Sequence, residues 1–440
     1  MRTIVGIALL TLSIFPYQLR AAPHETHLPE ATAGNGIRQQ ATVSAAKPTV
    51  VASAAKKGDD VALREMIGQM IIIGFEGSRV SDPSIRRLLT KIENGQITGV
   101  LYLQRNIASK KATAAMNNAM QKVAPSPVLI AIDQEGGAIQ RIPPSLGFPA
   151  LPPAKTVASK MSPRRAYEAY SSLAIALSQW GFNLNLGPVA DLDVNPQSPA
   201  IGRLGRSFSR DVETVVQYAA AFVDAHREHG VLTALKHFPG HGSARADSHD
   251  GFVDVSRTSK PSELTVFERL IDDDFADLVM VGHTFDAKYQ PNGKLPATLD
   301  AQIVRALLRN QIGYKGPVIT DDLQMAAVAG RFPLREAVVS SVLAGNDLLV
   351  FGNSKTVDPD IDVKVTNILV QEAAQDPKIK AAIARAAKRV AALKQRLLPG
   401  VDKTTTRSID RAVSYITPDF MRSQRRDYAL VPGPWVQNGN

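Results

Sequence analysis

The sequence of 440 residues contains no cysteine. This absence excludes disulfide bonds, thiol nucleophiles and zinc or iron–sulfur centres held by cysteine, and with them the lipid-modified cysteine of a lipoprotein anchor. Aromatic residues are scarce, at 6% of the chain. The 51 lysines and arginines give a net charge of +10, but they are scattered and no aromatic residues are interleaved with them. We therefore expect a solvated basic surface and no nucleic-acid groove.

The N-terminus has the order of charge and hydrophobicity of a secretory signal peptide. Arg2 supplies a positive charge, and the apolar run 4–15 that follows is too short for a comfortable membrane span. Ala21 and Ala22 offer small residues for cleavage, so we expect a signal peptide over residues 1–22. This predicts a periplasmic or secreted protein. It would be tethered to the membrane only if the segment were retained as an uncleaved signal anchor.

Composition divides the rest of the chain into three parts. Residues 23–58 are rich in alanine, threonine, proline and serine with little apolar periodicity, which is typical of a flexible linker. Residues 401–440 form an irregular C-terminal tail. Residues 59–400 between them carry regular apolar patterns, and the 44% hydrophobic content of the chain is sufficient for a large core.

Short apolar runs alternate with amphipathic helical stretches in this central part. We count eight strand-like runs, at 70–75, 97–103, 127–133, 181–189, 231–238, 276–282, 316–322 and 346–352. Nearly all are continuously apolar, as is typical of strands buried on both faces of a parallel sheet. Helical stretches such as 163–181, 211–230 and 333–345 separate them, and the last two end in a glycine suited to a helix C-terminus. Eight such units favour an α/β fold, a single-domain (β/α)8 TIM-like barrel. A doubly wound open sheet is the alternative, but no G-x-G-x-x-G follows the first strand.

Ionisable residues stand where three of these strands end. Asp133 ends the third strand, Lys236 and His237 end the fifth, and Asp321 and Asp322 end the seventh. Active sites of (β/α)8 barrels lie at the carboxyl ends of their strands. The sequence therefore predicts a functional site on that face of the barrel.

The segment VITDDLQM carries two adjacent carboxylates. One aspartate at a strand end is readily explained as the N-cap of the next helix, because its side chain accepts a hydrogen bond from the first turn. Two exceed what capping needs. One of Asp321 and Asp322 is therefore a candidate nucleophile or a stabiliser of a cationic transition state.

The segment DQEGGAIQR places Asp133 before a two-glycine turn that lets the backbone approach a ligand closely. Asp133 and Arg141 could grip sugar hydroxyls by charge-assisted hydrogen bonds, or they could form a salt bridge that braces the loop. We interpret Glu135 as structural. Arg203 and Arg206 in IGRLGRSF form a weak signal, because loop arginines are usually solvated. Two further aspartates are interpreted as supporting partners or caps, namely Asp191 and Asp193.

The loop KHFPGHGSARADSHDGF holds three of the eight histidines. His237 and His241 have the i, i+4 spacing of a helical metal site, but a proline and a glycine between them forbid a helix, so we expect no metal. In an extended loop residues i and i+2 point the same way, so Asp247 can hydrogen-bond His249. That contact orients the ring and favours its protonated form near neutral pH. The glycine-rich stretch before it would let the loop close over a substrate and reopen.

Taken together, KHFPGHG followed by DSH, with DQEGG upstream and ITDDLQM downstream, resembles the bacterial β-N-acetylhexosaminidases of glycoside hydrolase family 3 (NagZ-type). The resemblance covers residues 60–398 in the same motif order. It implies that Asp247 and His249 form an acid/base dyad and that Asp321 is the nucleophile. The residues that it implies for binding N-acetylglucosamine (GlcNAc) are Asp133, Arg141, Arg206, Lys236 and His237. One position departs from the family, which often reads DQEGGR where this chain has Ala138.

The resemblance implies a retaining exo-β-N-acetylglucosaminidase that needs no cofactor. Its implied substrates are peptidoglycan fragments that end in GlcNAc, and export would add chitin-derived oligosaccharides to them. We expect a monomer. Two alternatives stay open: a β-N-acetylglucosaminide phosphorylase, in which phosphate replaces water, and a non-catalytic cell-wall sugar-binding barrel.

Overall fold

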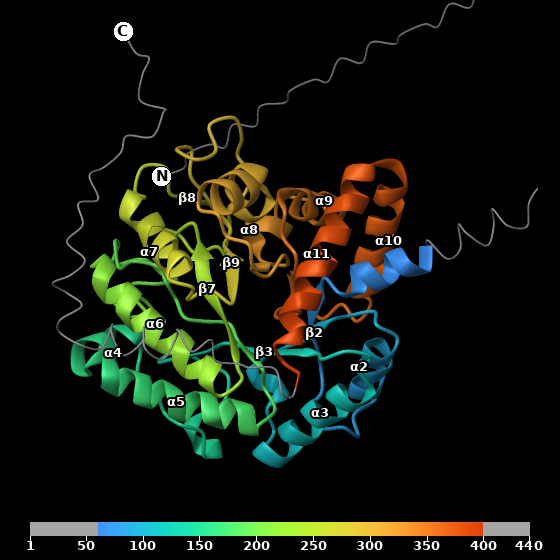
Figure 1. Cartoon of the computed structure of the whole chain (residues 1–440), viewed down its shortest axis with the longest axis horizontal. Helices are drawn as coiled ribbons and strands as arrows, with labels where there is room; N and C mark the ends of the chain where they lie inside the picture. The colour runs from blue at the N-terminus through green and yellow to red at the C-terminus, as the bar shows by residue number, and fades with distance from the viewer. Residues whose placement is uncertain (1–59, 399–440) are drawn as a thin grey trace, which may run out of the picture. The chain divides into compact units, whose positions relative to one another are not determined.

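The computed structural model describes residues 60–398, which form a barrel of eight parallel strands with helices outside it (Figure 1). The proposed signal peptide (1–22), linker (23–58) and C-terminal tail (401–440) lie outside the described residues. The strand order around the barrel is β11-β9-β7-β6-β3-β2-β1-β12. A parallel bridge between Ile319 and Leu348 connects the two ends of the sheet, so the predicted (β/α)8 barrel is confirmed.

All eight predicted strands are present, each inside its predicted run. They are β1 (Ile71–Gly74), β2 (Gly99–Tyr102), β3 (Leu129–Ile132), β6 (Leu184–Asn185), β7 (Leu232–Phe238), β9 (Leu278–Val281), β11 (Val318–Thr320) and β12 (Leu349–Phe351). Every residue in these strands is buried. The continuous apolar runs are thus explained, since both faces of each strand are covered.

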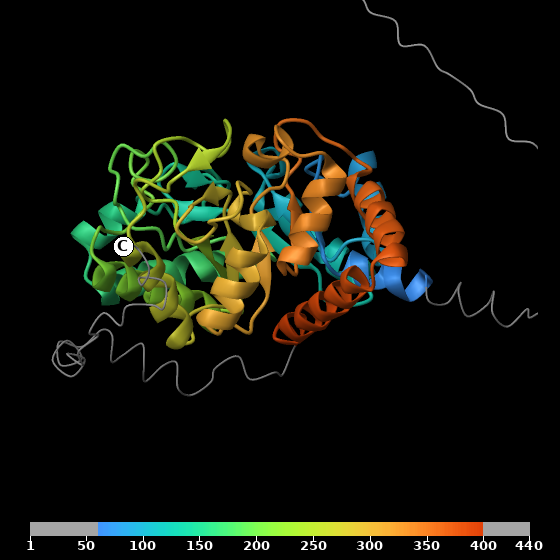
Figure 2. The same cartoon turned by 90° about the horizontal axis from the view of Figure 1, so that it is seen from above.

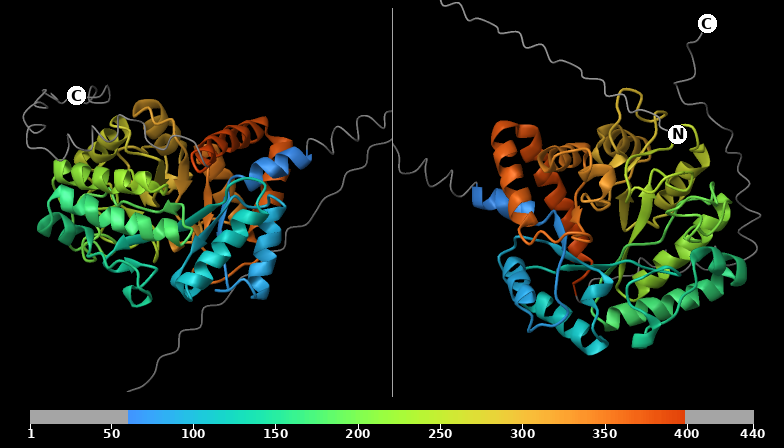
Figure 3. Two further views of the ribbon diagram at one scale, coloured as in Figure 1. Left: turned by 60° about the horizontal axis from the view of Figure 1, so that its bottom comes forward. Right: turned by 180° about the vertical axis from the view of Figure 1, so that it is seen from behind.

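Each strand is followed by a helix on the outside of the barrel, as the two views in Figure 3 show. A helix over residues 60–68 precedes β1. The outer helices are α2 (Pro83–Glu93), α3 (Lys110–Val123), α4 (Ala154–Lys160), α5 (Pro163–Gln179), α6 (Val212–Glu228), α7 (Pro261–Asp272), the π-helix η4 (Gln302–Gln311), α8 (Ala326–Ala329), α9 (Leu334–Ala344), α10 (Ile361–Gln375) and α11 (Pro377–Gln395).

The helix ends follow from local chemistry. Side chains of Ser162 and Asp211 accept hydrogen bonds from the first turns of α5 and α6. The two glycines expected at helix ends, Gly230 and Gly345, both have positive φ, at 73° and 109°. This left-handed conformation is what the C-terminus of a helix requires and what glycine adopts at least cost.

The barrel interior is closed at its amino end by α11. Val390 and Leu393 of this helix join the cluster of interior strand side chains. The Lys394 ammonium of the same helix reaches Thr98 and Ser126, which lie just before β2 and β3, at 3.0 and 2.8 Å. In Figures 1 and 2, α11 is the red helix that lies against one end of the barrel. The opposite end, where the strands finish, is left for a site.

The hairpins and loops after the strands are short except after β3, β6, β7 and β9. The small hairpin β4 (Gln134–Gly136) and β5 (Ile139–Gln140) follows β3, and a parallel pair, β8 (Val253–Asp254) and β10 (Thr284–Phe285), lies beyond β7 and β9. These insertions carry most of the predicted site residues. No helix within 60–398 is both long and apolar enough to cross a membrane.

Candidate active site

The carboxyl ends of the strands open into a cavity of about 250 Å³. Seven of the eight predicted site residues line it, namely Asp133, Arg141, Arg206, Lys236, His237, His249 and Asp321. The eighth, Asp247, does not line the cavity but contacts His249 directly. The structure therefore brings together in one place residues that are spread over almost 190 positions of the sequence.

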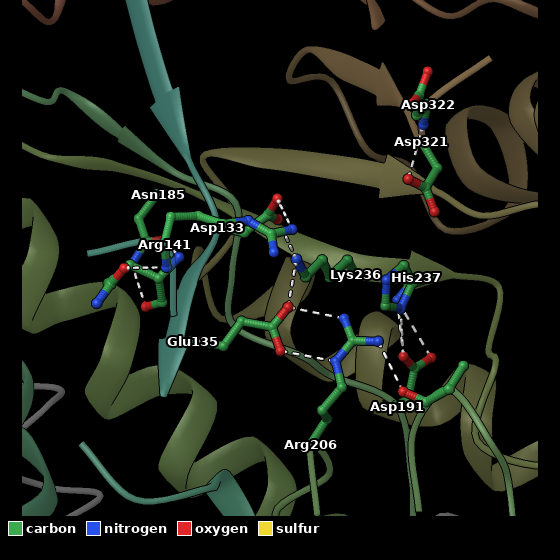
Figure 4. A network of polar contacts seen from close by, with 12 residues as sticks. Asp133, Glu135, Arg141, Asn185, Asp191, Arg206, Lys236, His237, Asp321 and Asp322 are labelled. Atoms are coloured by element: carbon green, nitrogen blue, oxygen red, sulfur yellow. Dashed lines mark hydrogen bonds and ion pairs between the residues drawn. The ribbon is translucent and has the colours of Figure 1, made fainter. Parts of the chain in front are cut away.

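Lys236, at the end of β7, is the centre of a network of ion pairs on one wall of the cavity (Figure 4). Its ammonium lies 2.9 Å from Asp133 Oδ1 and 2.6 Å from Glu135 Oε1. Arg141 reaches the other oxygen of Asp133 at 3.2 Å. Arg206 grips Glu135 with two parallel hydrogen bonds of 2.9 and 2.8 Å. Such two-pronged pairing fixes direction as well as distance, so the wall is preorganised.

The charges of this wall hold one another in the ionised state. Burial favours neutral carboxyls, but the facing Lys236 and Arg141 outweigh it and keep the pKa of Asp133 well below its usual range. Likewise Arg206 and Lys236 outweigh burial and lower the pKa of Glu135 to about 2. Burial would lower the pKa of Lys236, yet its two carboxylate partners raise it. At neutral pH the wall therefore presents fixed cations and anions, which suits the hydroxyl groups of a sugar.

His237 is held from behind by Asp191. The Nδ1 of His237 lies 2.7 Å from Asp191 Oδ2, and the backbone N–H of His237 also donates to that carboxylate. The other oxygen of Asp191 accepts the backbone N–H of His241 at 2.7 Å. Asp191 is fully buried, and although burial alone would raise its pKa, His237 and His241 lower it. The ring of His237 is thus fixed with Nε2 left for the cavity.

Asp321 follows β11 directly and lines the cavity. Burial opposes ionisation of its carboxyl, but the imidazoles of His283 and His237 and the backbone N–H of Asp322 lower its pKa. The expectation that one aspartate is the N-cap of the next helix was wrong, because α8 begins at Ala326 after Met325 and has no side-chain capping bond. Asp322 instead holds the loop that precedes α8. Its Oδ1 accepts the backbone N–H groups of Gln324 and Gly352, both at 2.9 Å.

The Asp247–His249 contact has the geometry expected from the i, i+2 spacing. His249 Nδ1 lies 2.7 Å from Asp247 Oδ1, and the backbone N–H of His249 donates to the same oxygen at 2.9 Å. These contacts outweigh burial and lower the pKa of Asp247. The His249 side chain is 60% exposed. With Nδ1 bound to the carboxylate, Nε2 is the nitrogen free to exchange a proton with a ligand.

Two positions change in interpretation. Glu135, interpreted as structural from the sequence, lines the cavity and pairs with both Lys236 and Arg206. His283, which sequence reasoning did not single out, is fully buried and donates from Nε2 to the carbonyl of Asp322. Glu135 could have been found, because it stands two residues after Asp133 in an extended segment and so shares its direction. No comparable local signal pointed to His283.

Among the remaining sequence candidates, His241 lines the cavity, whereas two others lie outside its lining. Arg203 does not contribute to it, and Asp193 pairs with Lys155 at 2.8 Å. Between Asp60 and Leu398, no cluster of three or more histidine, aspartate or glutamate side chains is placed to hold a metal ion. His241, whose spacing from His237 suggested a metal, has its Nε2 3.3 Å from the Ser248 hydroxyl.

Several known proteins that are similar to this chain in sequence or in fold are named as hexosaminidases or β-N-acetylglucosaminidases. Beta-hexosaminidase of Xylella fastidiosa is 32% identical over 302 residues, covering 66% of this chain and 85% of that protein. Beta-hexosaminidase of Vibrio cholerae is 30% identical over 285 residues, covering 64% and 83%. Among solved structures, a glycoside hydrolase family 3 β-N-acetylglucosaminidase from Paenibacillus superposes with a TM-score of 0.70 at 30% identity, covering 80% of this chain and 68% of that one.

A second solved structure, a β-N-acetylhexosaminidase from Beutenbergia cavernae, gives a TM-score of 0.68 at 29% identity, with 76% of this chain and 98% of that one covered. The model of the glycosyl hydrolase family 3 N-terminal domain matches residues 62–393, which is nearly the whole described barrel. The predicted resemblance is confirmed: the chain belongs to glycosyl hydrolase family 3, and it is a glycoside hydrolase.

Proposed function

We propose that the protein is a retaining exo-β-N-acetylglucosaminidase that removes non-reducing terminal GlcNAc. Asp321 is the nucleophile, His249 is the general acid and base, and Asp247 orients His249. A GlcNAc unit is held by Asp133, Arg141, Arg206, Lys236 and His237. The observation that carries this proposal is the convergence of an ionised carboxylate, a carboxylate-bound imidazole and a rigid charged wall on one cavity.

The size and charge of the cavity favour removal of single sugars. Its volume of about 250 Å³ lies at the small end of ligand pockets, which typically span roughly 300–1,000 Å³. Room for one monosaccharide suits cleavage from a chain end. The relatives whose names specify hexosaminidase or β-N-acetylglucosaminidase activity support GlcNAc as that sugar.

Two displacements at the anomeric carbon account for the reaction. In the first, an Asp321 oxygen forms a bond to the anomeric carbon, the glycosidic bond breaks, and the departing oxygen takes the proton from His249 Nε2. In the second, His249 accepts a proton from water, the water oxygen bonds to the anomeric carbon, and Asp321 leaves as a carboxylate. Two inversions retain the β configuration. The lowered pKa of Asp321 keeps its nucleophilic form available at neutral pH.

A carboxylic acid usually donates the proton in retaining glycosidases. Here we assign this step to the imidazole of His249, whose Nδ1 lies 2.7 Å from Asp247, so that the ring is oriented with Nε2 available for the leaving oxygen. The substitution of imidazole for carboxyl also avoids a second anion beside Asp321, which would oppose ionisation of the nucleophile.

We propose peptidoglycan fragments or chitin-derived oligosaccharides as substrates, acted on in the periplasm or outside the cell. The compartment rests on the charge-then-apolar order of residues 1–22. We propose that the enzyme acts as a monomer and without a cofactor, since the two carboxylates and the imidazole supply the nucleophile and the proton.

Replacement of the nucleophile tests the proposal. Asp321→Ala should lower kcat for 4-nitrophenyl β-GlcNAc by at least about 10³-fold, because the variant lacks the carboxylate that forms the covalent intermediate. NMR of the first product of the unaltered enzyme should show the β anomer. An α anomer would refute a retaining mechanism, and an unchanged rate in Asp321→Ala would refute the nucleophile.

The alternatives give different products in the same assay. GlcNAc 1-phosphate formed in phosphate buffer would identify a phosphorylase. Binding of GlcNAc oligosaccharides with no turnover of any aryl glycoside would identify a sugar-binding barrel. A panel of aryl β-GlcNAc, β-GalNAc and β-glucose substrates measures the sugar preference, and we expect β-GlcNAc to have the highest kcat/KM.

A further inference from the structure

Ser248 is the one buried residue in the loop segment 245–250, where it stands between the two members of the dyad. It is 3% exposed, whereas the other five residues of this segment are half-buried or exposed. It lies in a turn that is closed by the Asp250 N–H, which donates to the Asp247 carbonyl at 3.0 Å. Burial of one small polar residue in an exposed loop indicates a point of attachment.

Two contacts attach Ser248 to different parts of the barrel. Its hydroxyl lies 3.3 Å from Nε2 of His241, which belongs to the loop that leaves β7. Its backbone carbonyl accepts the N–H of Ala327, in α8, at 3.1 Å. Helix α8 follows Asp321 by only a few residues. The segment that carries the dyad is therefore fixed between the sugar-binding side and the nucleophile side of the cavity.

His241 is itself rigidly held. Its backbone N–H donates to Asp191, the same carboxylate that orients His237, and the rings of the two histidines lie 5.7 Å apart. Asp191 thus fixes both the sugar-facing imidazole and the imidazole that contacts Ser248.

The His241 ring is neutral. Burial, together with the neighbouring His237, lowers its pKa to about 4. Its Nδ1 has no hydrogen-bond partner within the described barrel. Since a buried lone pair without a partner costs less than a buried N–H without one, Nε2 carries the proton and donates it to the Ser248 hydroxyl.

We propose that His241 and Ser248 are positioning residues that anchor the loop so that His249 Nε2 stays within reach of the glycosidic oxygen. The inference rests on the proposed role of His249 as acid and base. Neither residue touches the reacting atoms in this scheme. Small misplacements of a catalytic group are costly, because proton transfer needs hydrogen-bond distance. Loss of the anchor should therefore reduce proton transfer and leave sugar binding unchanged.

Substrates whose leaving groups differ in basicity distinguish a positioning role of Ser248 from a general structural role. Departure of 2,4-dinitrophenolate needs no proton, whereas departure of phenolate does. In Ser248→Ala we expect kcat/KM for phenyl β-GlcNAc to fall about tenfold, the effect of one lost hydrogen bond. For 2,4-dinitrophenyl β-GlcNAc, kcat/KM should stay within about twofold, since that ratio reports the first displacement alone.

Conservative replacement of His241 provides the rescue experiment. The Gln side chain places an N–H donor near the position of Nε2, so His241→Gln should keep most of the phenyl glycoside activity. His241→Phe fills similar space without a donor and should behave as Ser248→Ala does. Ser341→Ala is the matched control, because Ser341 is a buried serine of α9 whose hydroxyl has no hydrogen-bond partner in the described part of the chain. It should leave both rates unchanged.

The outcomes distinguish this inference from the proposed function. His249→Ala should show the strongest dependence on the leaving group, and if it shows none, the acid role of His249 fails. Suppose that His249→Ala shows this dependence, but Ser248→Ala lowers kcat/KM equally for the phenyl and the 2,4-dinitrophenyl substrates, or for neither. The anchor is then refuted while the proposed function stands. Circular dichroism checks whether Ser248→Ala folds. If it does not, equal kcat/KM of His241→Gln and His241→Phe for the phenyl glycoside would refute the anchor.

Discussion

The two ends of the barrel contain the same kinds of side chain in different arrangements. At the amino end, just before β9, Asp277 accepts hydrogen bonds from Arg227 at 2.8 Å, from Arg396 at 2.6 Å and from the N–H and hydroxyl of Thr233 at 3.0 and 2.8 Å. Asp347, just before β12, is paired with two more arginines at 2.5 and 2.9 Å. Two of these four pairs use an arginine of α11 or of its C-cap, namely Arg389 and Arg396.

At the carboxyl end, the ion pairs border an open cavity. Lys236, Arg141 and Arg206 hold Asp133 and Glu135 in place, but all five side chains also line the space that a sugar would occupy. Ion pairs covered by a helix contribute to stability or to a unique arrangement, whereas ion pairs beside a cavity orient a ligand. The comparison predicts that substitutions at the two ends should separate stability from activity.

The largest effect should come from the amino end. Asp277→Ala leaves Arg227 buried without its partner and also removes the acceptor for Thr233. We expect unfolding free energy to fall by about 3 kcal/mol, the low end of the cost of breaking a buried pair, because Arg396 is 40% exposed and can turn to water. Urea denaturation measures the loss, and kcat/KM at a temperature where the variant is folded should be unchanged.

An exposed ion pair provides the control for that substitution. Arg164 and Glu168 lie 3.3 Å apart on α5, and their side chains are 77% and 59% exposed. Glu168→Ala should change stability by less than about 0.5 kcal/mol. Reduced turnover by folded Asp277→Ala protein would contradict the separation of the two ends.

At the carboxyl end, Glu135→Gln should affect activity more than stability. The change removes the charge that holds Arg206 by two hydrogen bonds and Lys236 by one ion pair. We expect kcat/KM for 4-nitrophenyl β-GlcNAc to fall about 30–100-fold, because both cations lose their fixed positions relative to the sugar. The amide still accepts one hydrogen bond, so the loss of stability should be about 1 kcal/mol.

Lys155→Ala is the comparison for Glu135→Gln. Lys155 pairs with Asp193 at 2.8 Å, but neither residue lines the cavity. This variant should retain kcat/KM to within about threefold. A larger loss in Lys155→Ala than in Glu135→Gln would show that activity depends on loop stability and not on the charged wall.

The same contrast explains how much could be predicted from the sequence. The strands were predictable because burial on both faces requires a continuous apolar run. The Asp247–His249 contact was predictable because the two residues are only two positions apart, although the structure forms it in a turn and not in an extended segment. Asp191 and His237 are 46 positions apart, and Arg396 and Asp277 are 119 apart. Such contacts depend on barrel closure and on where α11 crosses, and no local pattern encodes either. The resemblance to family 3 supplied those site residues that spacing could not.

A carboxyl near the amino end that lacks a cation of its own gives a prediction about the pH dependence of stability. Asp224, near the end of α6, is 7% exposed, and neither oxygen has a hydrogen-bond partner among residues 60–398. Arg227 is the nearest cation, but it is bound to Asp277. Burial, with the nearby acidic residues, raises the pKa of Asp224 to about 7.

The raised pKa fixes the direction of the pH dependence. The folded protein binds a proton at Asp224 that the unfolded chain, with an ordinary carboxyl pKa of about 3.9, has released, so stability falls as the pH rises from about 4 to 7. Asp224→Asn removes this dependence, but it still buries a polar group without a partner. The cost of burying the amide is the same at both pH values, so we expect the variant to gain a few kcal/mol over the native chain at pH 8, at ~1.4 kcal/mol per unit of pKa difference, and nothing at pH 4. Urea denaturation at both pH values measures this difference, and Glu168→Gln should show the same stability change at each. A gain at pH 4 as large as that at pH 8 would mean that packing, and not ionisation of Asp224, limits this end of the barrel.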